Sequence, residues 1–258
     1  MKLSELMSHC VLGAGSAELA EAGEDWMQGR SAFGGLQAAV ALRAMRTLVD
    51  APLRTLQMSF IAPVGPGLRA RARVLRAGKN ATHVEARLGA GDETLALIVG
   101  VFGIRRDSIV RHDVAAAVAM PILSKPTFAP GTMPKFMQHF DVALLAGAAP
   151  FTGARTGRAV YQLGLLDDGP ASEAHLLAFA DFVPPVALSW MPKPVPGASM
   201  TWMLEMLIDD LTSLPLDGWR ADTRMLAAAG GYTSQATTIY APDGTAAALS
   251  QQSMVVFG

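Results

Sequence analysis

Two adjacent glycines have a residue type and a position that could take part in catalysis. Gly34 and Gly35 stand at the entrance of residues 36–49, a stretch rich in Ala and Leu that predicts a mostly buried helix of about fourteen residues. A glycine pair lets a ligand or another backbone approach the first turn, where unpaired N–H groups and the positive end of the helix dipole lie. These amides could hold an oxygen that becomes negative during a reaction. Close packing against another helix is the alternative interpretation.

Signatures of several other catalytic chemistries do not occur in the sequence. It contains no Gly-x-Ser-x-Gly elbow, Walker loop, His-Glu-x-x-His helix or Rossmann fingerprint. The five histidines show no ligand spacing, so we expect neither a metal nor a cofactor. The single cysteine, Cys10, cannot form a disulfide within the chain and has no nearby His partner, which favours an inert thiol.

Charge and composition exclude several classes of partner. The chain of 258 residues is 51% hydrophobic and 17% charged with a net charge of −1, which indicates a folded protein and argues against nucleic-acid binding. No apolar run reaches about eighteen residues and no signal peptide is evident, so we expect a cytoplasmic protein without membrane insertion. The basic residues concentrate at one place: Arg69, Arg71, Arg73, Arg76 and Lys79. Their alternation predicts the solvated face of a strand, and a patch that attracts a nucleotide phosphate is the alternative.

The elements that must position the glycine pair follow it directly. Alternating apolar and polar residues predict strands at 53–62 and 68–75, and two more strands are predicted at 82–88 and 94–102, joined by a turn at 89–92. One buried helix followed by a meander of antiparallel strands indicates an α+β unit in which a sheet curls around the helix.

The second part of the chain repeats this order. Residues 225–258 parallel the segment that ends at 103, and both segments finish in Phe-Gly. Upstream, residues 171–188 take the place of the first helix, 199–208 that of the strand 53–62, and strands at 137–145 and 158–166 open the second copy. We therefore predict an N-terminal unit (1–104), a proline-containing linker with at most one short helix (105–134) and a C-terminal unit (135–258).

These features together resemble the acyl-CoA thioesterase II (TesB-like) family. The likeness rests on the Phe-Gly-Gly helix entrance, the strand ending in Ala-Pro-Val-Gly-Pro-Gly at 62–67, and Val-Leu-Arg-Ala-Gly-Lys-Asn at 74–80. The family pattern R-x-x-F-G-G-x-x-x-x-x-A-L is matched at Arg30, Phe33, Gly34, Gly35, Ala41 and Leu42. The likeness extends from about residue 26 to the C-terminus. It implies a double hotdog, in which each unit is an antiparallel sheet wrapped around a long central helix.

The resemblance also implies catalytic residues in the second copy. The run Leu-Leu-Ala-Phe-Ala places the family's Asp on Asp181, with one residue fewer in the spacing than expected. The family's Thr falls on Ser199, with Thr201 as a stand-in two positions along the same strand face. The family's Gln falls on Gln252, whereas Gln251 points to the opposite face. At the helix entrance of the first copy, we expect four substrate-binding residues: Phe33, Gly34, Gly35 and Gln37.

These residue types suit the hydrolysis of a thioester. An Asp, a hydroxyl and a Gln amide can hold a water and partly deprotonate it, while helix amides near Gly34 and Gly35 hold the oxyanion. The sequence therefore predicts an acyl-CoA thioesterase whose two units pair within one chain and which associates further into a homo-oligomer.

Two other functions remain open at this point. Thr201 and Trp202 stand where better-known members of the family carry an Asp-His pair, and this difference allows a non-catalytic acyl-CoA or lipid-binding protein. A hotdog hydratase or dehydratase would need an Asp/His acid-base pair on the first turn of a helix and its loop. The sequence shows no such pair, which disfavours that function.

Overall fold

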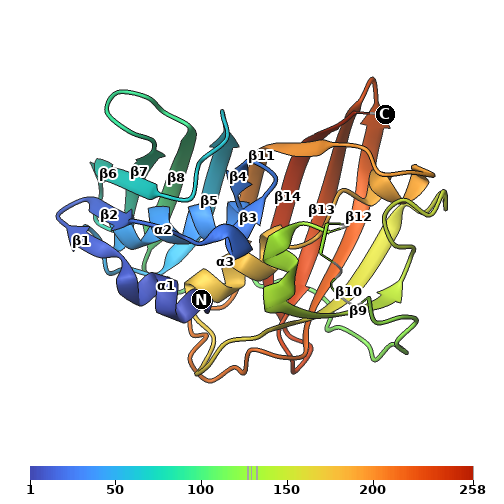
Figure 1. The fold of residues 1–258 in the computed structure, drawn as a ribbon. Coiled ribbons are helices and arrows are strands. Elements are labelled where there is room, and N and C mark those ends of the chain that lie inside the picture. Colours follow the sequence, from blue (N-terminus) through green and yellow to red (C-terminus); the bar gives the residue numbers. More distant parts are fainter. Residues whose placement is uncertain (127, 129, 132, 258) are drawn as a thin grey trace.

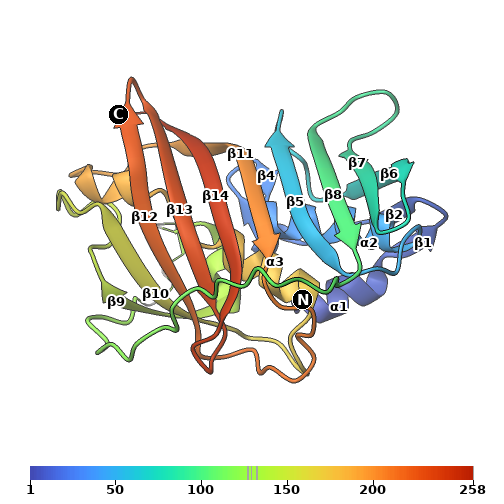
Figure 2. The same ribbon diagram turned by 180° about the vertical axis from the view of Figure 1, so that it is seen from behind.

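Two similar halves share one antiparallel sheet, and the helices gather on one face of it (Figure 1). The computed structural model spans residues 1–258 and describes all of them except 127, 129, 132 and 258. Seen from behind, the same sheet presents its strands to the viewer (Figure 2). This is the α+β double-hotdog arrangement that the sequence predicts.

The first half begins with a short helix and a narrow hairpin and continues with the buried helix and four strands. Its elements are α1 (Leu3–His9), β1 (Val11–Gly13), β2 (Ser16–Leu19), η1 (Glu24–Trp26), β3 (Met27–Gln28), β4 (Ser31–Ala32), α2 (Gly34–Arg46), β5 (Leu53–Phe60), β6 (Leu68–Ala77), β7 (Ala81–Leu88) and β8 (Ala96–Gly103). The helix α2 begins at Gly34 and ends at Arg46, so it includes the glycine pair and is shorter at its C-terminus than the sequence predicts.

The second half repeats the series. Its elements are η2 (Lys135–His139), β9 (Phe140–Ala146), β10 (Arg158–Leu165), α3 (Glu173–Asp181), η3 (Val186–Trp190), β11 (Gly197–Met206), β12 (Trp219–Ala229), β13 (Tyr232–Tyr240) and β14 (Ala246–Val256). The segment 171–188 therefore contains an α-helix followed by a short 3-10 turn, because Pro184 and Pro185 cannot continue the helix.

The strand order of the large sheet is the same read from either end. It runs β1-β2-β6-β7-β8-β5-β11-β14-β13-β12-β10-β9, so each strand of the first half has its counterpart at the mirrored place. The halves meet where β5 pairs antiparallel with β11, with Ser59 opposite Thr201 and Thr55 opposite Glu205. Two copies of one helix-plus-sheet unit, related by an approximate twofold axis between β5 and β11, produce this order.

The helices α2 and α3 pack side by side and run antiparallel. At one end Arg46, in the last turn of α2, donates two hydrogen bonds to Glu173 in the first turn of α3, one of them from Nε at 2.9 Å. At the other end the first turn of α2 lies against the last turn of α3, because a Cβ added to Gly35 would lie 2.9 Å from the Cα of Ala178. Antiparallel dipoles attract, and Glu173 and Arg46 each stand at the helix end that favours their charge.

The segment between the halves crosses the sheet on the side away from the helices (Figure 2). The described residues of 105–134 contain no helix. Their recorded contacts include a bridge between Ser124 and Leu144 and a hydrogen bond from the Ala117 N–H to the Gly244 carbonyl. We retain 105–134 as the proposed linker between the units 1–104 and 135–258.

Candidate active site

A small pocket opens where the two halves meet, at the junction of the first turn of α2 with the last turn of α3. Its volume is about 240 Å³. Both halves contribute its walls: Gln28, Ser31, Ala32, Gly34, Gln37, Phe60, Ile61, Ala62 and Pro63 from the first, and Asp181, Gly197, Ala198 and Ser199 from the second. A crevice shared by both copies therefore holds two of the residues expected to be catalytic.

Asp181 is the last residue of α3 and reaches across to the entrance of α2. A Cβ added to Gly34 would lie 2.6 Å from its Oδ2 atom, so only glycine leaves room for the carboxylate there. Asp181 is half-buried and lines the pocket. Burial raises the pKa of Asp181 to about 7, although the Gly35 N–H and the Gln252 amide favour the ionised form and act against that rise.

Gln252 lies directly beside this carboxylate. It is buried on β14, and its Nε2 donates a hydrogen bond of 2.6 Å to Oδ1 of Asp181. Its neighbour Gln251 is exposed and lines hollows on the outer face of the sheet, as the alternation of a strand requires. The structure thus brings Asp181 and Gln252 together over 71 positions of sequence.

The two candidate hydroxyls lie on different faces of the sheet. Ser199 lines the pocket with Asp181, whereas Thr201 is exposed and lines an outer hollow with Ser59 and Gln251. The expectation that Thr201 shares the face of Ser199 is wrong. The pairing of β11 with β14 shifts by one residue between Ser199 and Thr201, and such a bulge reverses the alternation of faces.

Of the four residues expected to bind substrate at the entrance of α2, two line the pocket and two do not. Gly34 and Gln37 line the pocket. Phe33 is fully buried and stacks on Phe136, with ring centroids 4.1 Å apart, so it belongs to the aromatic core rather than to the pocket wall. Gly35 faces the Asp181 carboxylate and the backbone of α3, which shows that helix packing is one reason for the glycine pair.

One supporting residue was not predicted from the sequence. Gln235 is 1% exposed on β13 opposite Gln252, and its Oε1 accepts a hydrogen bond of 2.9 Å from the Val186 N–H. It thereby fixes the segment that follows Asp181. A glutamine at an inward position of an alternating strand is a signal that could have pointed to it, because a buried amide needs partners.

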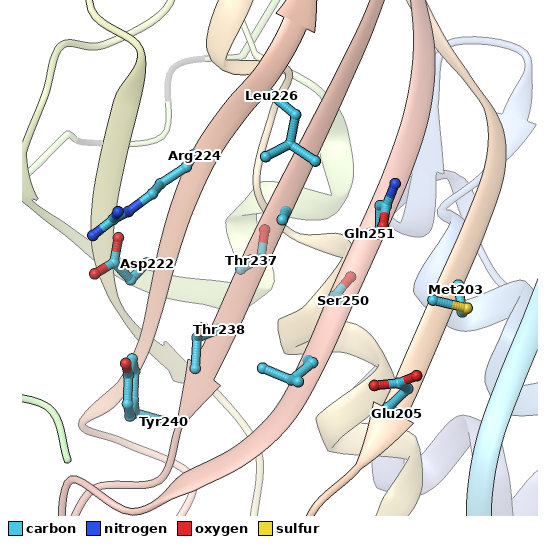
Figure 3. A pocket seen from close by; sticks show the side chains of 12 residues that line it. Met203, Glu205, Asp222, Arg224, Leu226, Thr237, Thr238, Tyr240, Ser250 and Gln251 are labelled. Atoms are coloured by element: carbon cyan, nitrogen blue, oxygen red, sulfur yellow. The ribbon is translucent and has the colours of Figure 1, made fainter. Parts of the chain in front are cut away.

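Two further hollows lie on the face of the sheet away from the helices. Figure 3 shows one of about 360 Å³, with Gln251, Glu205 and Arg224 around it. Its Asp222 carboxylate is already paired with Arg158 through hydrogen bonds of 2.8 and 2.6 Å. Neither hollow contains Asp181, which lines the smaller pocket, so we place the candidate active site in that pocket.

The part of the chain that the structure describes offers neither a cluster of metal ligands nor a membrane-spanning helix. No group of three or more His, Cys, Asp or Glu side chains there could hold a metal ion. None of the helices in that part combines the length and the apolar character needed to cross a membrane.

Comparison with known proteins identifies the family. The acyl-CoA thioesterase N-terminal domain matches residues 22–103, and the acyl-CoA thioesterase C-terminal domain matches residues 115–256. The chain therefore belongs to the acyl-CoA thioesterase family and is a thioester hydrolase. A search of curated protein sequences finds no match.

Solved structures share the fold over nearly the whole chain. A hotdog-fold protein of unknown function from Alicyclobacillus acidocaldarius is 19% identical with a TM-score of 0.87, covering 99% of this chain and 98% of its own. The tesB protein of Mycobacterium avium subspecies paratuberculosis is 12% identical with a TM-score of 0.79, covering 100% of both chains. The acyl-CoA thioesterase II TesB2 of Mycobacterium marinum is 15% identical with a TM-score of 0.72, covering 99% and 98%.

Proposed function

We propose that this chain hydrolyses the thioester bond of acyl-CoA with a water held by Asp181, Gln252 and Ser199. The observation that carries the proposal is the hydrogen bond from Gln252 to the carboxylate of Asp181, a residue that lines a pocket formed by both halves. A carboxylate whose pKa is raised to about 7 is suited to act as a general base near neutral pH. Thr201, on the outer face, has no part in the proposed mechanism.

In the proposed reaction, ionised Asp181 accepts a proton from the water while the water oxygen bonds to the carbonyl carbon. The π electrons of the carbonyl move onto its oxygen, which becomes an oxyanion. When this intermediate collapses, the C–S bond breaks, and the proton held by Asp181 passes to the departing thiolate. The products are a carboxylic acid and free CoA thiol, and no covalent enzyme intermediate is needed.

Release of free thiol from a panel of short, medium, long and aromatic acyl-CoA substrates tests the proposal. We expect turnover of at least one class by the wild type. Replacing the general base in Asp181→Asn should lower kcat by at least about 100-fold, since base catalysis typically contributes that much. Gln252→Ala should also lower kcat.

Gln251→Ala is the matched control, because it truncates the same side chain one position along the strand but on the outer face. It should retain wild-type turnover. Tight binding of acyl-CoA without turnover across the whole panel would contradict the hydrolase and favour the binding protein. Multi-angle light scattering on the same samples would test the expected homo-oligomer.

A further inference from the structure

Ser31 borders the candidate active site from the first half of the chain. It is half-buried at the start of β4 and lines the same pocket as Asp181. Its Oγ accepts two hydrogen bonds of 3.1 Å, one from the Val64 N–H and one from Nε2 of Gln37. A serine hydroxyl has two acceptor sites and one donor proton, so both acceptor sites are occupied.

The orientation of the Gln37 amide is fixed by a second contact. Its Nε2 also donates a hydrogen bond of 2.7 Å to the Ala32 carbonyl, which can only accept. The NH₂ group of Gln37 must therefore face Ser31 and Ala32, and Ser31 cannot donate to it. The hydroxyl proton of Ser31 therefore points away from the Gln37 amide and the Val64 N–H. The two hydrogen bonds that the oxygen accepts polarise the O–H group and make it a stronger donor.

One backbone N–H in the first turn of α2 is not available to bind a substrate in the pocket. The Gly35 N–H faces the Asp181 carboxylate and is not free to bind a substrate oxygen. Ser31 and Asp181 line the same pocket of about 240 Å³, so a thioester carbonyl placed beside Asp181 occupies a space that Ser31 also borders.

We propose that the Ser31 hydroxyl donates a hydrogen bond to the thioester carbonyl oxygen and stabilises the oxyanion that forms on it. Ser31 is then a catalytic residue, and Gln37 and the Val64 N–H are the groups that position it. This inference rests on the proposed thioesterase mechanism. It explains why a polar amide is buried on the otherwise apolar inner part of α2.

The test compares Ser31→Ala, Ser31→Thr and Ser31→Asp with the wild type, using the best acyl-CoA of the panel. Loss of an oxyanion donor typically lowers kcat by about 100-fold or more, so Ser31→Ala should lose about that much with KM changed less than about threefold. Ser31→Thr keeps the hydroxyl and should recover most of kcat. Ser31→Asp can accept both existing hydrogen bonds but has no proton to donate when ionised, so it should remain as poor as Ser31→Ala.

Ser253→Ala, on the outer face of β14, is the control and should keep wild-type kcat. Recovery of kcat in Ser31→Asp, or a kcat within about threefold of wild type in Ser31→Ala, would show that Ser31 is structural and overturn the inference. A rise in KM alone would overturn it as well, because the hydroxyl would then bind substrate and transition state equally.

A binding measurement keeps the inference testable if no substrate is hydrolysed. Calorimetry would compare a non-hydrolysable CoA thioether that carries a trifluoromethyl ketone, whose hydrate mimics the tetrahedral intermediate, with the same thioether lacking the carbonyl. The wild type should bind the fluoroketone more tightly, and Ser31→Ala should lose that preference. Equal binding of both compounds by the wild type would contradict the role of Ser31, whereas absent hydrolysis alone would contradict only the proposed function.

Discussion

At the scale of single residues, Asp181 is the group on which the proposed mechanism depends. Burial holds its pKa near 7, and the Gln252 amide and the Gly35 N–H act in the opposite direction. A carboxylate in solution has a pKa near 4 and would be a weaker base toward water. The site therefore depends on burial for the strength of the base and on hydrogen bonds for its ionisation.

The pH dependence of hydrolysis should reflect this carboxylate. Because the ionised form is the base, log kcat/KM should rise with pH and level off above about pH 7. In Gln252→Ala the midpoint should move to higher pH, since the lost hydrogen bond favours the ionised form. A pH profile from 5 to 9 checks both, and a flat profile would exclude Asp181 as the base. Gln251→Ala should keep the wild-type midpoint.

The same carboxylate should lower stability at high pH. Its folded pKa lies above its unfolded value of 3.8, so its contribution is fully present below pH 3.8 and is lost as pH rises through about 7. The full shift corresponds to at most about 4 kcal/mol, reduced by the solvent contact through the pocket. Asp181→Asn should therefore unfold at higher urea concentration than the wild type at pH 8, with a smaller difference at pH 4.5. Equal midpoints at both values would contradict the burial of the charge.

Part of the candidate active site could be predicted from the amino-acid sequence. Asp181 and Gln252 could be assigned because the resemblance to the acyl-CoA thioesterase II family implies a position for each, and the structure puts the two side chains in contact. The sheet face on which Thr201 lies could not be predicted. One extra residue in the pairing of β11 with β14 reverses which side chains point toward the helices, and no feature of the sequence indicates that bulge. Ser31 could not be predicted either, since its role follows from which atoms donate to it.

At the scale of elements, the glycine pair lets α2 and α3 approach at the end where the pocket lies. An added Cβ at Gly34 would meet the Asp181 carboxylate and the Phe60 ring, whereas one at Gly35 would meet the backbone of Ala178. Alanine normally stabilises a helix interior by about 1 kcal/mol relative to glycine. Here the close contact overrides that preference.

Substitution of the two glycines should therefore separate activity from stability. Gly34→Ala should lower kcat/KM at least about tenfold by displacing Asp181, because small misplacements of catalytic groups cost large factors in rate. Gly35→Ala should lower the free energy of unfolding by about 2 kcal/mol, because the helices must move apart. Kinetics and urea titration measure the two effects. Gly157→Ala, where an added Cβ meets nothing within 4 Å, should change neither, and wild-type behaviour of Gly34→Ala would contradict the contact with Asp181.

At the scale of the whole molecule, the N-terminal helix is tied to the second half by a buried carboxylate. The Asp167 side chain is 0% exposed and accepts hydrogen bonds from the N–H and Oγ of Ser4, at 2.7 and 2.5 Å, and one from Nε2 of His175 at 3.1 Å. His175 donates from Nε2, because its Nδ1 accepts from the Ser172 N–H. The imidazole is thus neutral, and burial lowers its pKa.

Loss of this contact should loosen the N-terminal helix. Ser4→Ala removes one hydrogen bond to a buried charge and should lower the free energy of unfolding by about 2 kcal/mol. Ser8→Ala on the same helix removes only a bond to the Glu5 carbonyl at an exposed site and should cost less than about 0.5 kcal/mol. Urea unfolding at pH 7.5 compares the two variants. Equal effects of both would contradict the role of Asp167.

The ion pair between Arg46 and Glu173 has a consequence for the number of catalytic centres. The approximate twofold axis relates the pocket at the first turn of α2 to the opposite end of the helix pair, where a second centre would lie in a symmetric dimer of single units. There the Arg46 guanidinium pairs with Glu173, donates to the Ala51 carbonyl and lies 4.9 Å from the centre of the Phe102 ring. A polypeptide with two hotdog units should consequently titrate with one equivalent of a tight transition-state analogue, while the ion pair at the other end holds the two helices together.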